Sequence, residues 1–354
     1  MAELNGEEAE RKLRSRLAAR TLKRLGLVYV STDALTIRRQ RRGDGWTFIS
    51  GNGRTIRDEL ERARLKKLAV PPAYQDVLYA ADPRAHIQAI GRDAAGRLQY
   101  RYHPEWEKVR EQKKAKRLQR LVEALPRVRR AVNKHLGAAV PTREFALSAV
   151  IELVTCSAIR AGGEAYVKSN RTRGAATLLK SNIAVDGATV ALKFRAKGGK
   201  NIDKEFRCPR VAAAVNVLRA LPGRRMFQYR GEDGVRIVTA SDVNAFLREI
   251  AGVKISLKDF RTLCASAAAL EALAHIEPAA SERERRRQVK DAVTAVSEEL
   301  ANTPTIARKS YVHQTVVAAF ESGKLEKFSE GLKGRRSPAH REQLLAQVVA
   351  TMAA

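Results

Sequence analysis

The pattern of hydrophobic and polar positions changes partway along this chain of 354 residues. Up to His103, short runs alternate apolar and polar side chains, which is typical of half-buried β-strands. Two such runs, AHIQAIG and GRLQYRYH, flank a turn at residues 92–96, and LTIRRQRRGDGWTFIS holds two more around Asp44-Gly45, a dipeptide that favours the tight turn of a hairpin. We therefore expect a small β-rich domain over residues 1–103.

One helix is expected within this first domain. Thr55 and Asp58 precede the stretch IRDELERARLKKL, and side chains of these types cap helix N-termini. The sequence Val70-Pro71-Pro72 stops the helix, because proline lacks the backbone N–H that would continue it.

After His103-Pro104 the spacing of apolar residues becomes helical. From Glu105 to Arg130 there are ten Lys or Arg against four Glu, so one helix face is either solvated or turned toward phosphates. The following stretch TREFALSAVIELVTCSAIR is apolar nearly all round, which predicts a buried helix ended by Gly162-Gly163. Arg160 should therefore lie at the end of a core element.

The period returns to strict alternation between Ser181 and Cys208, where two glycine turns predict a three-stranded antiparallel sheet. Helices are expected again in RVAAAVNVLRAL, SDVNAFLREI, SLKDFRTLCASAAALEALAHI and residues 281–301, and finally in SPAHREQLLAQVVATM. The fold class is therefore α+β. Residues 104–354 form a mainly helical domain with an inserted sheet and a C-terminal helical extension.

Charge adds a class of partner to this picture. The 67 Lys and Arg exceed the 38 Asp and Glu by 29, and the excess is spread along the chain rather than held in one tail. An extended basic surface of this kind favours nucleic acid as the partner, with a merely solvated surface as the alternative. No stretch approaches the roughly 20 apolar residues of a membrane helix, and the charged N-terminus has no signal-peptide core, so a cytoplasmic protein is expected.

Metal and cofactor sites are not expected. The cysteines Cys156, Cys208 and Cys264 stand singly in mainly apolar stretches, which favours reduced core residues. The six histidines are dispersed and form no metal-binding spacing.

The stretch NTPTIARKSYVHQTVVAAF, residues 302–320, raises the question of a reactive tyrosine. Thr303 and Pro304 are a good N-cap and first-turn pair, so one helix is expected from there to Phe320. At about 100° per residue, Ile306, His313, Val317 and Phe320 share one stripe, and Tyr311 points away from it. Tyrosines most often pack, so the neighbouring residues must decide whether Tyr311 reacts.

A hydroxyl that attacks a phosphodiester needs cations on the non-bridging oxygens and a proton for the leaving oxygen. The chain offers AIRAGGEAY with Arg160, FRAKGGK with Lys197, KDFRTL with Lys258 and Arg261, and ANTPTIARKSY with Asn302 and Tyr311. Singly, Arg160 could cap a helix, Lys197 could be a solvated turn residue and Arg261 a surface charge.

In this order the four segments resemble the active-site segments of type IB DNA topoisomerases of the compact poxvirus and bacterial kind. The sequences VPPAYQDV, HIQAIGRDAAGRLQYRYHPEW and DVNAFLREI are similar to further parts of that family, so the resemblance runs from about Leu27 to Phe320. It implies relaxation of supercoiled double-stranded DNA by a monomer that clamps the duplex, at the bacterial nucleoid, with no ATP, metal or small-molecule cofactor.

The resemblance also implies roles for single residues. Tyr311 would be the nucleophile that forms a 3′-phosphotyrosyl bond, Arg160 and Arg261 would bind the non-bridging oxygens, and Lys197 would protonate the leaving 5′ oxygen. Asn302 stands where poxvirus members carry histidine, and its amide can still donate to a phosphate oxygen. The side chains expected to touch the duplex are Gln99, Tyr100, Tyr102 and Lys258.

Two departures from the family pattern keep other readings open. Gly163 stands where asparagine is usual, and Ala196 stands where glycine commonly precedes the lysine. A tyrosine recombinase shares the Arg, Lys, Arg, Tyr set, although it usually carries histidine at the position of Lys258 and a helical domain in front. A catalytically inactive, architectural DNA-binding protein is the other alternative.

Overall fold

The computed structural model describes residues 20–43, 45–138, 140–332 and 338–353, so Asp44 of the expected hairpin turn lies outside the described residues. The chain forms two compact units, Met1–Gln112 and Lys113–Ala354, which we consider separately. Their boundary falls inside the long helix α3, Pro104–Gly137. The division of function after His103 stays a prediction.

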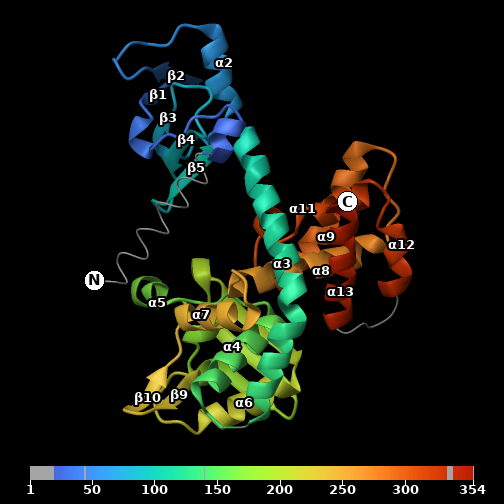
Figure 1. Cartoon of the computed structure of the whole chain (residues 1–354). Helices are drawn as coiled ribbons and strands as arrows, with labels where there is room; N and C mark the ends of the chain where they lie inside the picture. The colour runs from blue at the N-terminus through green and yellow to red at the C-terminus, as the bar shows by residue number, and fades with distance from the viewer. Residues whose placement is uncertain (1–19, 44, 139, 333–337, 354) are drawn as a thin grey trace. The chain divides into compact units, whose positions relative to one another are not determined.

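The first unit is built on a five-stranded antiparallel sheet in the order β2-β1-β3-β4-β5 (Figure 1). Leu65 of the helix α2 packs with Ile37, Phe48 and Tyr79 of the sheet in a small core. The elements of this unit before α3 are the 3-10 helix η1 (Thr32–Ala34), β1 (Ile37–Arg42), β2 (Gly45–Ile49), α2 (Glu59–Lys67), β3 (Gln75–Tyr79), β4 (Ile87–Arg92) and β5 (Leu98–Tyr102). The expected hairpin and the two expected strands are confirmed.

The start of α2 differs slightly from the expectation. Asp58 alone caps the helix, because its Oδ1 accepts hydrogen bonds from the backbone N–H groups of Leu60 and Glu61 at 2.8 and 3.2 Å. Thr55 lies outside the helix, where it forms an isolated bridge to Ile49.

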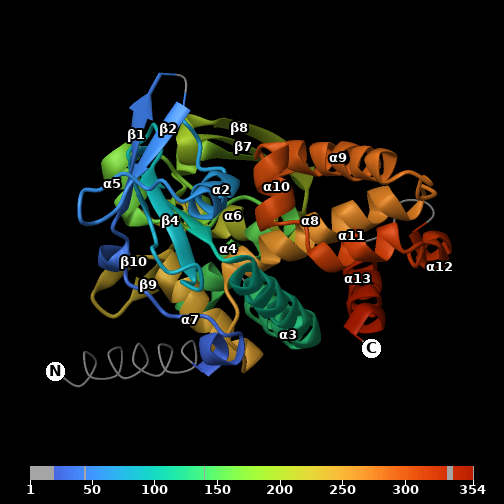
Figure 2. The same ribbon diagram turned by 90° about the horizontal axis from the view of Figure 1, so that it is seen from above.

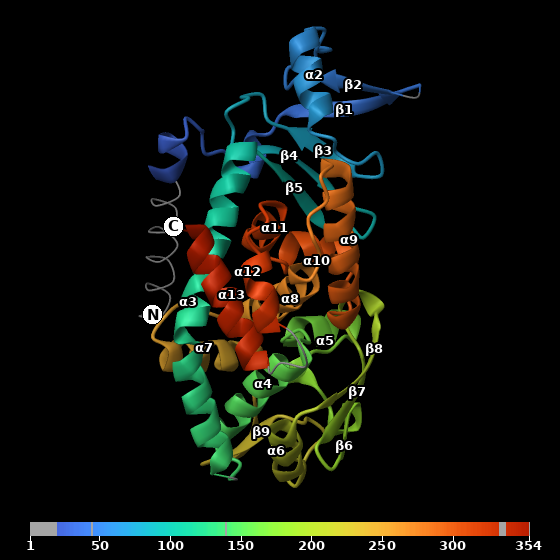
Figure 3. The same ribbon diagram turned by 90° about the vertical axis from the view of Figure 1, so that its right-hand side faces the viewer.

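The second unit is mainly helical (Figures 2 and 3). It holds one large hydrophobic core. Helix α4 is buried on nearly every side, as its uniformly apolar sequence predicts, and the long α3 turns Leu121, Val128 and Val132 into the same core. Its helices are α4 (Arg143–Ser157), α5 (Glu164–Asn170), α6 (Pro209–Arg219), α7 (Ala240–Ala251), α8 (Leu257–Ala274), α9 (Glu282–Glu299), α10 (Pro304–Ser310), α11 (Gln314–Glu321), α12 (Glu326–Ser329) and α13 (Pro338–Ala353). Four single 3-10 turns, η2 (Ala175–Thr177), η3 (Lys180–Asn182), η4 (Lys197–Gly199) and η5 (Glu330–Leu332), complete the helical elements described.

The inserted three-stranded sheet is confirmed as β6 (Ile183–Asp186), β7 (Thr189–Arg195) and β8 (Asn201–Arg207). Along β7, Val190, Leu192 and Phe194 are buried and the residues between them are not, which is the alternation that the sequence shows. Together with the first unit, this sheet confirms the α+β class. A further hairpin, β9 (Gln228–Gly231) and β10 (Gly234–Ile237), was not expected, although the turn dipeptide Asp233-Gly234 stands where the turn passes into β10.

The predicted end of the α4 helix was wrong. The helix ends at Ser157, and Ala158 adopts the left-handed conformation with a φ of 53°, while its N–H donates to the Val154 carbonyl at 2.8 Å. Gly162 lies beyond the helix, with a φ of 80°, against Gly174. A Cβ at Gly162 would stand 2.9 Å from the Gly174 nitrogen. Arg160 therefore lies in the loop after a core helix, not on the helix.

The single helix expected from Thr303 to Phe320 was also wrong. Helix α10 ends at Ser310, Tyr311 has a φ of −128° and a ψ of −37°, and α11 begins after His313. The expected stripe therefore fails at Ile306, which is 46% exposed, whereas His313, Val317 and Phe320 are buried.

Other helical expectations are confirmed. The predicted face of α9, formed by Val289, Val293, Val296 and the following Leu300, is buried. Helix α13 is present and packs against α8 and α11. Among the described residues, no helix has the length and apolar character needed to cross a membrane.

Candidate active site

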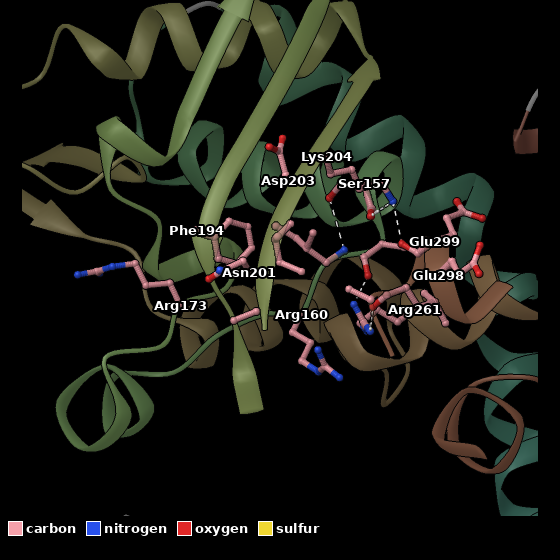
Figure 4. A pocket seen from close by; sticks show the side chains of 16 residues that line it. Ser157, Arg160, Arg173, Phe194, Asn201, Asp203, Lys204, Arg261, Glu298 and Glu299 are labelled. Carbon is pink, nitrogen blue, oxygen red and sulfur yellow. Dashed lines mark hydrogen bonds between the residues drawn. The ribbon is translucent and has the colours of Figure 1, made fainter. Parts of the chain in front are cut away.

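The ends of α4 and α9 meet at Arg261 of α8 in the second unit (Figure 4). The Arg261 guanidinium is 2% exposed and donates to the carbonyl of Ala158, just after α4, and to the carbonyl of Leu300, just after α9, at 3.3 Å. The final carbonyls of a helix have no donor within it, so a cation placed there satisfies them. Burial lowers the pKa of Arg261, and the neighbouring Tyr311 opposes that effect.

Arg160 and Asn302 form a pair beside this junction. The Arg160 Nη2 donates to Asn302 Oδ1, which joins the loop after α4 to the loop after α9. Asn302 is 8% exposed. Within the described part of the chain, the buried Asn302 Nδ2 and Arg261 Nε have no hydrogen-bond partner. Buried donors are rarely left open in a folded protein, so this position suits a ligand that brings acceptor oxygens.

Tyr311 lies against these cations. The Arg261 guanidinium carbon stands 4.8 Å from the centre of the Tyr311 ring, within the range of a cation–π contact. Burial acts to raise the pKa of Tyr311, but Arg261, Arg160 and Lys258 together outweigh it, so the pKa falls below the usual value. The tyrosine is half-buried and packs at the edge of the core. The earlier inference that it points away from the core is corrected, since the helix breaks beside it.

Ser266 stabilises the break between α10 and α11, a role that was not predicted from the sequence. Its Oγ donates to the Tyr311 carbonyl at 3.1 Å and accepts from the His313 N–H at 3.0 Å, and the residue is fully buried on α8. His313 Nδ1 then accepts from the Thr315 N–H at 3.1 Å and caps α11. A lone serine in an alanine-rich helix carries no sequence pattern that would reveal this role.

The two candidate lysines lie differently. Lys258 is exposed on the first turn of α8 and is close enough to help lower the pKa of Tyr311. Lys197 is exposed on the turn between β7 and β8, with its Nζ 5.1 Å from the ring centre of Tyr166. No contact described for Lys197 reaches Arg160, Arg261 or Tyr311, so the structure does not bring this residue together with them.

The DNA-contact candidates of the first unit all lie on β5. Tyr100 and Tyr102 share one face, with ring centres 5.8 Å apart and nearly parallel planes, and Tyr100 is 41% exposed. Arg110 lies over the Tyr102 ring at 4.5 Å. Gln99 faces the other way, and its Nε2 donates to Asp93 Oδ2 at 2.9 Å. The exposed Tyr100 is thus the best placed of the three to meet a ligand.

The cysteines are free, as expected, but two of them are not isolated from each other. Cys156 and Cys208 both donate to Glu152 Oε1, at 3.8 and 3.9 Å, so three potential metal ligands come together. Arg210 Nη2 lies 2.6 Å from the same oxygen. Because this guanidinium already neutralises Glu152, the cluster is poorly suited to a cation.

A further lysine, Lys204, lies inside the cavity at this site and was not singled out in the sequence. The cavity has a volume of about 280 Å³, and its charged lining residues are Arg160, Arg173, Arg261 and Lys204 together with Asp203, Glu298 and Glu299. The site as a whole combines open N–H donors with a tyrosine of lowered pKa, in a chain of net charge +29, and this combination is typical of an enzyme that binds a phosphate group of a nucleic acid.

Comparison with known families agrees with this character. Residues 103–336 match the family described as eukaryotic DNA topoisomerase I, catalytic core, and residues 45–93 match bacterial DNA topoisomerase IB, N-terminal domain. The chain is also 27% identical over 296 residues to a DNA topoisomerase 1B of Acanthamoeba polyphaga mimivirus, covering 81% of this chain and 88% of that protein. The chain belongs to the type IB DNA topoisomerase family. The family match spans all five candidate catalytic residues.

Proposed function

We propose that this topoisomerase relaxes supercoiled double-stranded DNA through Tyr311. The phenolic hydroxyl of Tyr311 loses its proton to solvent and its oxygen attacks a backbone phosphorus, the bond from phosphorus to the 5′ oxygen breaks, and a 3′-phosphotyrosyl bond forms. The freed strand can then rotate about its partner. Attack by the 5′ hydroxyl reverses the step and releases Tyr311. One phosphodiester is exchanged for another, so the cycle balances without ATP.

The observation that carries this proposal is the position of Tyr311 against Arg261, beside the open N–H groups of Arg261 and Asn302. The lowered pKa of Tyr311, where cations outweigh burial, supports its role as a nucleophile. Arg160 supplies a second guanidinium. Asn302, which is hydrogen-bonded to Arg160, supplies a neutral N–H donor beside it. These side chains can bind the charge that develops on the phosphate, which is the part of catalysis that preorganised donors serve best.

Lys197 donates the proton to the leaving 5′ oxygen in this scheme. Its ammonium must first leave the Tyr166 ring, and we propose that the DNA draws it in. The turn that carries it contains Gly198 and Gly199, with φ values of 80° and 75°, which only glycine adopts readily. Bound phosphates then compete with the ring for the charge.

The proposed partner is a duplex clamped by a monomer. Tyr100 and Tyr102 would contact it from the first unit and Lys258 from the second, and Gln99 would do so only after release from Asp93. We propose that the enzyme works without a metal or small-molecule cofactor, in the cytoplasm at the nucleoid.

The experiment is relaxation of supercoiled plasmid DNA in EDTA without nucleotide. We expect supercoils of either sign to be removed, with the linking number of the plasmid changing in steps of one. A strict need for magnesium or ATP would contradict the proposal. Exchange of strands between two duplexes would point to a recombinase instead, and binding without relaxation would point to an architectural protein.

A further inference from the structure

Lys204 on β8 joins the ends of two helices. Its Nζ donates to the carbonyl of Ser157 at 2.8 Å and to the carbonyl of Glu299 at 3.1 Å, as the dashed lines in Figure 4 show. Ser157 is the last residue of α4, and Glu299 is the last residue of α9. Both carbonyls lie where a helix leaves acceptors unsatisfied and its dipole is negative, so one ammonium serves both ends.

This link is the first of three that follow one another along the two loops. Lys204 joins Ser157 to Glu299, and one residue further on, Arg261 joins Ala158 to Leu300. Two residues beyond these carbonyls, Arg160 meets Asn302 directly. These three links hold the loops after α4 and α9 side by side, and the Lys204 link to Glu299 is the furthest from Tyr311 along the sequence.

The surroundings of Lys204 favour an ammonium that is bound by protein carbonyls over one that is exposed to solvent. The side chain is half-buried in the wall of the site cavity. Burial lowers its pKa, while Glu299 opposes that effect. Two of its three N–H bonds are engaged by carbonyls, and such a buried network rigidifies the segments that it joins.

We propose that Lys204 is a positioning residue for DNA cleavage: it holds the ends of α4 and α9 in register so that Arg160 and Asn302 meet the same phosphate. The proposal rests on the function proposed above for that site. Lys204 acts through the two loops and does not itself touch the reacting atoms. Misplacing catalytic groups by about 1 Å can lower a rate about 100-fold, so a residue that only positions the two loops can still affect the cleavage rate.

The variants should separate charge, shape and position. Lys204→Met keeps the length of the side chain and removes the ammonium, whereas Lys204→Arg keeps a cation that can bridge two carbonyls. Lys193→Met is the matched control, because Lys193 lies on the neighbouring strand β7, where its ammonium forms an exposed ion pair with Asp203 at 3.3 Å.

The first measurement is the rate of covalent adduct formation at saturating DNA, with DNA affinity measured separately. For Lys204→Met we expect a rate lowered by about 10- to 100-fold with affinity within about twofold of wild type. Lys204→Arg should recover most of the rate, and Lys193→Met should resemble wild type. An unchanged rate in Lys204→Met, or a loss confined to affinity, would overturn the proposal.

Two further variants of the assay exclude other roles. If Lys204 acts through the Asn302 loop, Lys204→Met and Asn302→Ala should lower the rate less together than the product of their separate effects. A DNA substrate with sulfur in place of the leaving 5′ oxygen needs no proton donor. Recovery of Lys204→Met on that substrate would make Lys204 the proton donor and contradict positioning.

Amide hydrogen exchange tests the same proposal without catalysis. In Lys204→Met, exchange should accelerate in residues 157–162 and 299–303, with little change elsewhere, whereas Lys193→Met should leave both segments unchanged. Unaltered exchange in these segments would contradict the proposal. If wild type forms no adduct at all, the proposed function fails, and hydrogen exchange still decides the role of Lys204.

Discussion

Replacing Ser266 by alanine should weaken the break that presents Tyr311. The Ser266 hydroxyl donates a hydrogen bond to the Tyr311 carbonyl and accepts one from the His313 N–H. The Ser266 side chain is fully buried, so water cannot replace these bonds at the serine. A buried polar group left without its partner costs about 1 to 3 kcal/mol. The alanine variant leaves both a carbonyl and an N–H open, so we expect a loss of about 2 to 4 kcal/mol in the stability of the second unit.

Ser148→Ala is the matched control on α4. Ser148 is as deeply buried as Ser266, but within the described residues its hydroxyl has no hydrogen-bond partner. Removing an unsatisfied buried hydroxyl takes nothing away from the fold, so the stability should stay within about 0.5 kcal/mol of wild type or rise slightly.

The two units can be followed separately during urea unfolding. Both tryptophans, Trp46 and Trp106, belong to the first unit, so their fluorescence serves as an internal reference. Helical circular dichroism reports mainly on the second unit. Ser266→Ala should shift only the helical transition and slow adduct formation, and Ser148→Ala should do neither. Equal stability losses in the two variants would refute the role assigned to the Ser266 hydrogen bonds.

Three other predictions concern charge. DNA affinity should fall steeply with salt, with a log–log slope of about −0.9 per phosphate neutralised, and a flat salt series would contradict the basic-clamp proposal. Lys197→Ala should slow cleavage about 100-fold or more, and a sulfur leaving group should restore the rate; no recovery would exclude Lys197 as the proton donor. Burial raises the pKa of Glu342 to about 7 despite Arg129. The folded state therefore holds that proton longer, and up to about 3 kcal/mol of stability should be lost as pH rises from about 4.5 to 7, an effect that Glu342→Gln should remove.

Local sequence chemistry predicted the sheets well. Asp186-Gly187 and Gly198-Gly199 mark the two turns of the inserted sheet, and the alternation along β7 matches its buried face. Such features act over a few residues, so they can be recognised in the sequence. The β9–β10 hairpin was overlooked although its turn is marked in the same way.

The break at Tyr311 could not be predicted from helix periodicity, because its cause lies 45 residues away. No glycine or proline lies near Tyr311 to require a stop, since Pro304 in the first turn is the single proline of residues 302–320 and glycine is absent there. The stop is stabilised by Ser266 of α8 and by the His313 cap. Contacts of this kind override local propensity and appear only once the helices are packed.

The candidate site was predicted in part. The family resemblance selected Arg160, Arg261, Asn302 and Tyr311, and these four residues lie around the ends of α4, α9 and α10. Lys197 lies apart on its turn. The role of Lys204 could not be predicted, because it depends on two backbone carbonyls that are far apart in sequence, and the sequence does not show which carbonyls a side chain will meet.

The most direct test of the central claim is to trap the adduct on end-labelled duplex DNA with denaturant and to locate the linkage. Wild type should yield a covalent 3′-phosphotyrosyl adduct at Tyr311. Tyr311→Phe should yield none while binding DNA as well as wild type, since the variant lacks only the phenolic oxygen. An adduct formed by Tyr311→Phe, or a wild-type linkage to the 5′ phosphate, would contradict the claim.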